Sequence, residues 1–204
     1  MISHSSDSRS PENGEGDTIT TEQPPSSSKQ RGYCHIYTGN GKGKTTAAFG
    51  LAVRALMAGK KVYIAQFVKS MKYNETKLES IVDGLVIRQY GNGCFIYKNA
   101  PTDVDIAMAV DGLADCERLL NSSDQYQYDV VILDEITIAI HYNLIKVDDV
   151  VRVIQARNPK IEIIVTGRYA PQELIDVGDV VTEMKAIKHY FTTLGVKARD
   201  GIER

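Results

Sequence analysis

Short runs of consecutive apolar residues alternate along the chain with longer segments whose apolar residues recur every three or four positions. Runs of the first kind predict buried β-strands, and segments of the second kind predict amphipathic helices. We expect strands at 33–38, 61–67, 85–90, 128–135, 161–167 and 180–185, and helices at 45–59, 102–123, 147–158 and 170–178.

This alternation of strands and helices predicts an α/β fold with a mostly parallel sheet of about six strands and helices on both faces. Each connection between parallel neighbours must be a right-handed crossover, which a helix provides. Open sheets of this kind bind ligands at the carboxyl ends of their strands. We therefore look for a functional site among the residues that follow the strands.

Residues 1–32 have a different composition, rich in Ser, Pro and acidic residues, with only Met1, Ile2 and Ile19 as sizeable apolar side chains. Such a segment cannot bury enough surface to offset the entropy that ordering costs. It also lacks the apolar core of a secretory signal peptide. We expect a disordered tail over 1–32 and one folded domain over 33–204.

The composition and charge of the chain limit the kinds of molecule that it is expected to bind. Hydrophobic residues make up 43% of the chain and charged residues 25%, with a formal net charge of −2. This charge gives no electrostatic footprint for nucleic acid, and no apolar run approaches the roughly 20 residues of a membrane span. Cys34, Cys94 and Cys116 are too widely spaced to suggest a disulfide framework or a zinc site. We predict a cytoplasmic protein that binds neither nucleic acid nor membrane.

The stretch GNGKGKTT, residues 39–46, lies between the first predicted strand and the first predicted helix. Glycines in this setting let the backbone point its N–H groups at an anion. Lys44 would reach the terminal phosphates of a nucleotide, and the Thr45 hydroxyl is placed to bind Mg²⁺. The P-loop consensus G-x-x-x-x-G-K-[ST] is matched from Gly43 onward, with Thr38 at its first position. The stretch predicts a P-loop NTPase-like fold that binds a nucleoside triphosphate.

The fourth predicted strand ends in two carboxylates, Asp134 and Glu135. Carboxylates at the edge of the sheet that carries a phosphate loop can hold Mg²⁺ directly or through water. No guanine-reading [NT]-K-x-D motif is present, which favours ATP over GTP. These motifs leave open whether ATP is hydrolysed, transferred or only bound.

Over residues 33–203 the chain resembles the P-loop-type cob(I)alamin (corrinoid) adenosyltransferases. The segments that carry the resemblance are 38–50, 65–69, 132–137, 156–160, 163–168, 187–191 and 196–203. The resemblance implies transfer of the 5′-deoxyadenosyl group of ATP to the reduced cobalt of a corrinoid, with triphosphate as leaving group, in cobalamin biosynthesis or salvage. It also implies Mg²⁺, an electron donor such as a reduced flavoprotein, and a homodimer. The alternatives are a recombinase-type ATPase, whose nucleic-acid partner the near-neutral charge disfavours, and a regulatory ATP-binding module.

The resemblance also implies roles for individual residues. Catalytic roles would fall to Lys44, Thr45 and Glu135, and Mg²⁺ would be held by Thr45 and Glu135 with support from Asp134. Nucleotide contacts are expected from Gly39, Asn40, Gly41, Lys42, Gly43, Lys44, Thr45, Thr46 and Arg54. Corrinoid contacts are expected from Phe95 and Tyr97, and by their position at the end of the second predicted strand also from Gln66 and Lys69. Many relatives begin with a basic helix that caps the corrinoid site, and the Ser/Pro/acidic segment 1–32 could not form it.

Overall fold

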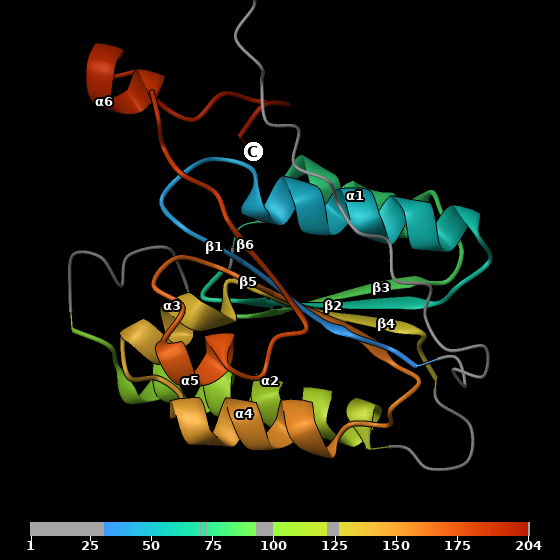
Figure 1. Ribbon diagram of the computed structural model, residues 1–204. Helices are drawn as coiled ribbons and strands as arrows, with labels where there is room; N and C mark the ends of the chain where they lie inside the picture. The colour runs from blue at the N-terminus through green and yellow to red at the C-terminus, as the bar shows by residue number, and fades with distance from the viewer. Residues whose placement is uncertain (1–30, 70, 72, 93–99, 122–126, 204) are drawn as a thin grey trace, which may run out of the picture.

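The computed structural model describes residues 31–69, 71, 73–92, 100–121 and 127–203 (Figure 1). Its centre is a six-stranded sheet in the order β3-β2-β4-β5-β1-β6, in which every pair of neighbours is parallel. The strands are β1 (Cys34–Thr38), β2 (Val62–Phe67), β3 (Leu85–Tyr90), β4 (Val130–Asp134), β5 (Glu162–Thr166) and β6 (Val180–Glu183). All six predicted strands are therefore present, and the predicted α/β class is confirmed.

The four predicted helices are also present, with shorter bounds for most of them. They are α1 (Lys44–Met57), α2 (Asp103–Leu120), α4 (Val147–Ala156) and α5 (Gln172–Ile175). A capping box fixes the start of α2, because Thr102 and Asp105 each accept a hydrogen bond from the other's backbone N–H. Three further elements were not predicted: η1 (Asn74–Ser80), α3 (Ile136–His141) and α6 (Tyr190–Leu194).

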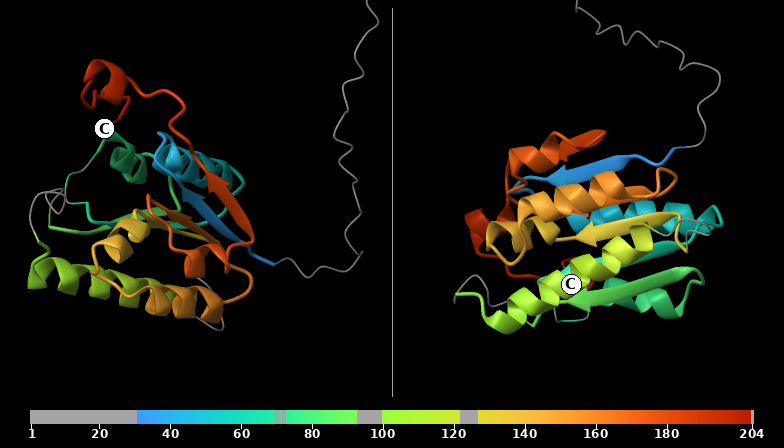
Figure 2. Two further views of the ribbon diagram at one scale, coloured as in Figure 1. Left: turned by 60° about the vertical axis from the view of Figure 1, so that its left-hand side comes forward. Right: turned by 90° about the horizontal axis from the view of Figure 1, so that it is seen from below.

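Helices lie on both faces of the sheet, as Figures 1 and 2 show, and each face has its own apolar core. α1 and η1 cover one face, and α2, α3, α4 and α5 cover the other. The side chains of β2 and β4 are buried along their whole length, because both strands lie inside the sheet and are covered on both sides. The edge strand β6 is exposed along its whole length.

The fold brings the ends of three strands together. The loop that follows β1, the carboxylates that end β4 and the turn that follows β5 all lie at the carboxyl edge of the sheet, where α6 and the C-terminal segment also project (Figure 1). Since β5 separates β1 from β4, the phosphate loop and the acidic strand end lie one strand apart. Across the described ranges, none of the helices combines the length and the apolar character that crossing a membrane requires.

Candidate active site

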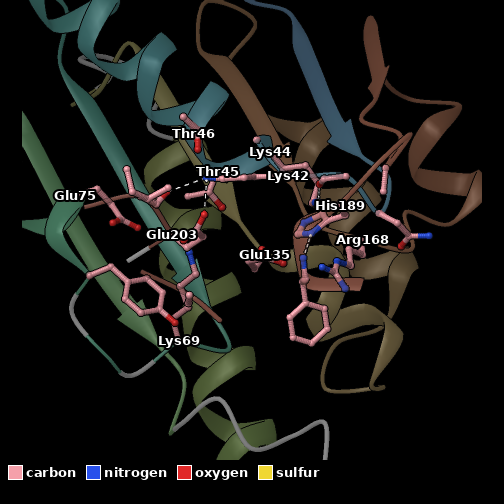
Figure 3. A pocket seen from close by; sticks show the side chains of 18 of the residues that line it. Lys42, Lys44, Thr45, Thr46, Lys69, Glu75, Glu135, Arg168, His189 and Glu203 are labelled. Carbon is pink, nitrogen blue, oxygen red and sulfur yellow. Dashed lines mark hydrogen bonds and ion pairs between the residues drawn. The ribbon is translucent and has the colours of Figure 1, made fainter. Parts of the chain in front are cut away.

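A pocket of about 1060 Å³ lies at this carboxyl edge (Figure 3). Residues 40–46 form one wall, Glu135 and Arg168 project from the ends of β4 and β5, and the C-terminal segment forms a further wall. Ligand pockets of proteins usually span about 300–1,000 Å³, so this one is at the upper end of that range. It has room for more than one small ligand.

Two of the loop glycines are required by close packing within the protein. Gly39 has a φ of +95°, and a Cβ atom there would lie 2.5 Å from the carbonyl oxygen of Met184. A Cβ on Gly41 would lie 2.7 Å from the same oxygen, which accepts a 2.6 Å hydrogen bond from the Gly41 N–H. The loop is therefore held against the end of β6, and the N–H of Gly41 is bound to protein.

Helix α1 begins directly after Gly43, whose φ is +116°. No side chain caps this end of the helix, and its first turn contains no acidic residue. The first N–H groups of a helix have no partner within the helix, and its dipole is positive at this end. Since Gly43, Lys44, Thr45 and Thr46 line the pocket, α1 offers an anion site there.

Lys44 is buried beneath the loop, with 6% of its surface exposed. Its Nζ donates to the carbonyl oxygens of Gly39 (2.9 Å) and Gly41 (2.8 Å). An ammonium group has three donors, so one remains for a ligand. Burial lowers the pKa of Lys44, because it disfavours the charged form. No carboxylate of the described residues pairs with this lysine, and a bound phosphate would supply the missing charge.

Asp134 is fully buried and accepts four hydrogen bonds. Its Oδ1 accepts from the hydroxyls of Thr45 (2.9 Å) and Thr166 (2.7 Å). Its Oδ2 accepts from the Nε2 of Gln66 (3.2 Å) and the Nζ of Lys69 (2.7 Å). Burial by itself would raise the pKa of Asp134, but the charge of Lys69 and these hydrogen bonds outweigh it and hold the pKa below its usual value.

Because Asp134 already accepts four hydrogen bonds, Asp134 and Glu135 have different roles. Because Thr45 donates its hydroxyl proton to Asp134, the Thr45 oxygen keeps its lone pairs for another ligand. Asp134 is thus placed to orient Thr45. Glu135 turns away from the strand with a φ of +61°, and its carboxylate lines the pocket. Burial, followed by the neighbouring charge of Asp134, raises the pKa of Glu135.

The Thr45 hydroxyl and the Glu135 carboxylate are hard oxygen donors of the kind that Mg²⁺ prefers. Among the described residues, no group of three or more His, Cys, Asp or Glu side chains could hold a metal by itself. Nucleotide-bound Mg²⁺ needs only one or two protein ligands, because phosphates and water complete its coordination. The two residues therefore fit a magnesium ion that arrives with a nucleotide.

The structure brings together most of the site residues predicted from the sequence. Residues 40–46, Lys69 and Glu135 line the pocket, and Gly39 packs beneath the loop. Arg54 lies on the exposed side of α1 and does not line the pocket. Gln66 has no exposed surface, since its amide bridges Asp134 and Gln89. Phe95 and Tyr97 lie outside the described residues.

The C-terminal segment, residues 189–203, was not predicted to take part in the site, yet it lines much of the pocket. Lys42 of the phosphate loop donates to the carbonyl oxygen of Ile202 (2.9 Å) and pairs with Glu203 (3.3 Å). Glu203 also accepts hydrogen bonds from Tyr190 and Arg199. These contacts tie the end of the domain to the loop, and the sequence indicated this only through the family-like segments 187–191 and 196–203.

Arg168 also lines the pocket, although the sequence analysis assigns it no role. It lies two residues after the end of β5, exposed at the pocket and beside Glu135 in Figure 3. The signal that could have found it is its position, because a cation within two residues of the carboxyl end of a buried parallel strand falls on the ligand-binding edge of the sheet.

Comparison with known proteins agrees with this geometry. Residues 30–204 match the protein family described as ATP:corrinoid adenosyltransferase BtuR/CobO/CobP. The corrinoid adenosyltransferase of Escherichia coli K12 is 34% identical over 174 residues, which cover 85% of this chain and 86% of that protein. The corrinoid adenosyltransferase CobA of Salmonella typhimurium is 34% identical over 175 residues, covering 86% and 87%. A corrinoid adenosyltransferase of a Sinorhizobium species is 36% identical over 178 residues, covering 85% and 81%.

Among solved structures, the flagellar accessory protein FlaH of Methanocaldococcus jannaschii superposes with a TM-score of 0.48 and 18% sequence identity. The superposition covers 76% of this chain and 71% of FlaH.

Proposed function

We propose that this chain, which belongs to the ATP:corrinoid adenosyltransferase BtuR/CobO/CobP family and is a corrinoid adenosyltransferase, joins C5′ of ATP to the Co(I) ion of a reduced corrinoid. Triphosphate is released in the same reaction. The observation that carries this proposal is the position of the phosphate loop at one wall of a pocket much larger than a phosphate site needs. The remaining volume is open to a second substrate. Phe49, Phe67, Val68 and Ile138 give part of it an apolar lining.

The electron balance of the reaction explains what the pocket must supply. An electron pair of the substrate's Co(I) ion forms the bond to C5′. The C5′–O bond breaks, and its electron pair leaves on the triphosphate. Cobalt ends formally as Co(III). No proton is transferred in this step, so the pocket needs no general base, and none of the protein's side chains has to act as nucleophile.

The chain's own residues stabilise the charge that develops on the leaving group. Lys44, the first N–H groups of α1 and the remaining loop N–H groups act as preorganised donors toward the phosphate chain. Thr45 and Glu135 would hold Mg²⁺, which, when bound, neutralises phosphate charge and so assists departure of the triphosphate. Asp134 keeps the Thr45 oxygen aimed at that ion, and Lys69 keeps Asp134 in place.

The remaining roles follow from the family. We propose Phe95, Tyr97 and Lys69 as corrinoid contacts, a reduced flavoprotein as electron donor, a homodimer as the working unit, and a place in cobalamin biosynthesis or salvage in the cytoplasm. A recombinase-type ATPase is not favoured, because the chain matches the corrinoid adenosyltransferase family and its relatives in Escherichia coli and Salmonella typhimurium are named corrinoid adenosyltransferases.

An anaerobic assay tests the proposed reaction. The protein is incubated with ATP, Mg²⁺ and chemically reduced cobalamin, the absorption spectrum is followed, and the phosphate products are separated by ion chromatography. We expect adenosylcobalamin and triphosphate in equal amounts, with no product when EDTA is present. Release of orthophosphate or diphosphate without a change in the corrinoid spectrum would contradict the proposal.

Replacing Glu135 with glutamine tests the magnesium site. An amide carries no charge and binds Mg²⁺ more weakly than a carboxylate, so we expect the Mg²⁺ concentration for half-maximal activity to rise about tenfold or more. Glu183→Gln, at the exposed edge strand, is the matched control and should leave the titration unchanged. Superimposable Mg²⁺ titrations of Glu135→Gln and the unmodified protein would exclude Glu135 as a ligand.

A further inference from the structure

The turn that follows β5 contains two residues with positive φ, on either side of Arg168. Gly167 has a φ of +135°, and a Cβ atom there would lie 2.2 Å from the Oγ1 of Thr137. Two residues later, Tyr169 has a φ of +61°, a conformation that residues other than glycine rarely adopt. Arg168 lies between them and projects into the pocket. Backbone of this kind persists only where the surroundings fix it, and it is concentrated at functional sites.

Contacts from β1 fix both ends of the turn. The N–H of Gly167 donates to the carbonyl oxygen of Tyr37 (3.2 Å), and the N–H of Ala170 donates to the Oγ1 of Thr38 (3.3 Å). Thr38 occupies the position of the first glycine in the P-loop consensus. Its hydroxyl oxygen accepts the hydrogen bond that holds the turn after β5 in place.

Contacts from α3 fix the middle of the turn. The Oγ1 of Thr137 donates to the carbonyl oxygen of Arg168 at 2.6 Å. The ring of Tyr169 stacks on that of His141, with centroids 4.2 Å apart and planes 27° apart. The backbone of Arg168 is therefore positioned by contacts from β1 and α3, and its side chain starts from a fixed point at the edge of the pocket.

The guanidinium of Arg168, in contrast, has no hydrogen-bond or ion-pair partner among the residues that the structure describes. The lysines of the loop and of the end of β2 are engaged: Lys42 with Glu203, Lys69 with Asp134, and Lys44 with two carbonyl oxygens. Arg168 lies near enough to Lys44 for its charge to help lower that pKa, after the larger effect of burial. The Glu135 carboxylate interacts electrostatically with both cations, but it forms no ion pair with either of them, so both can bind a further anion in the pocket.

We infer that Arg168 is a further catalytic residue of this enzyme, whose guanidinium binds oxygens of the ATP phosphate chain and of the triphosphate leaving group opposite Lys44. This inference rests on the proposed function and adds a residue to it. A guanidinium suits the task, because its planar fork of donors matches phosphate oxygens in pairs and it stays charged at every working pH. As the C5′–O bond breaks, charge increases on the same oxygens, so the contact strengthens in the transition state.

Binding of inorganic tripolyphosphate in the presence of Mg²⁺, measured by titration calorimetry, tests the inference without the corrinoid. Arg168→Gln should weaken tripolyphosphate binding by about 10- to 100-fold, the usual cost of losing a charge-assisted hydrogen bond. Arg168→Lys keeps the charge but not the fork and should lie between Arg168→Gln and the unmodified protein. Arg118→Gln, an exposed arginine on α2, is the matched control and should bind tripolyphosphate normally.

Enzyme kinetics and a melting curve of Arg168→Gln distinguish phosphate binding by Arg168 from corrinoid binding and from a purely structural role. In the adenosylation assay, Arg168→Gln should lower kcat/KM for ATP by a similar factor and leave both the KM for the corrinoid and the melting temperature unchanged. Unchanged tripolyphosphate binding, a raised corrinoid KM or a lowered melting temperature would each overturn the inference. If instead the unmodified enzyme forms no adenosylcobalamin, the proposed function fails, and the calorimetric result still decides whether Arg168 binds phosphate.

Discussion

Replacement of Lys44 by alanine should lower kcat/KM for ATP by at least about two orders of magnitude, because loss of one preorganised charge at a leaving group costs about 3 kcal/mol. The Nζ of Lys44 is held by two loop carbonyl oxygens and directed at the pocket. Lys60→Ala, at an exposed lysine in the turn after α1, is the matched control and should keep full activity. Equal kcat/KM values for Lys44→Ala and the unmodified enzyme would exclude the loop as the phosphate site.

The pH dependence of kcat/KM for ATP tests the role of Lys44 independently. Burial lowers the pKa of Lys44 below its ordinary value of 10.5 in the free enzyme, and kcat/KM reports ionisations of the free enzyme. As the pH rises through this lowered pKa, the ammonium loses its charge, so kcat/KM for ATP should fall on an alkaline limb below pH 10.5. The limb should be missing from the residual activity of Lys44→Ala.

Replacement of Asp134 by asparagine should have the largest effect on stability. Removal of one partner from a buried ion pair leaves the other charge unpaired, which costs about 3–5 kcal/mol. Here the unpaired charge would be the ammonium of Lys69, whose side chain is 12% exposed. For a domain of this size the loss corresponds to a fall in melting temperature on the order of 10 °C. Activity should fall as well, since Thr45 loses the acceptor that orients it.

Two variants show whether the ion pair is the cause. Asp129→Asn changes a half-buried aspartate just before the start of β4 that accepts one hydrogen bond, from the N–H of Lys61, and it should cost only about 1 kcal/mol. Asp134→Asn combined with Lys69→Met should recover part of the lost melting temperature, because no buried charge then remains unpaired. If the double variant melted below the single variant, the explanation through Lys69 would be wrong.

Much of this architecture could be predicted from the sequence because the strands are buried on both faces. β2 and β4 appear in the sequence as nearly continuous apolar runs, which only a covered parallel sheet requires. The position of residues 40–46 at the pocket could also be predicted, since the glycines and Lys44 form a pattern typical of phosphate-binding loops. Each apolar strand run, like the glycine-rich loop, is contained within a single short segment of the chain.

The elements that sequence reasoning missed depend on contacts between distant segments. α3 begins one residue after β4 ends, and the residue between them is Glu135, whose positive φ separates strand from helix. The amide of Gln66 was expected at a ligand, but its pairing with Asp134 and Gln89 depends on which strands are neighbours. In the same way, the contact between Lys42 and Glu203 joins residues at opposite ends of the domain. No local pattern encodes such pairings.

Carbon-13 NMR of the corrinoid product tests the central proposal most directly. The enzyme is supplied with ATP labelled with ¹³C at C5′, together with Mg²⁺ and chemically reduced cobalamin. The account predicts that the label appears in the isolated corrinoid as a carbon bonded to cobalt, with one triphosphate released for each labelled corrinoid. If the label stayed in a nucleotide while phosphate accumulated, the pocket would belong to a hydrolase and the account would be contradicted.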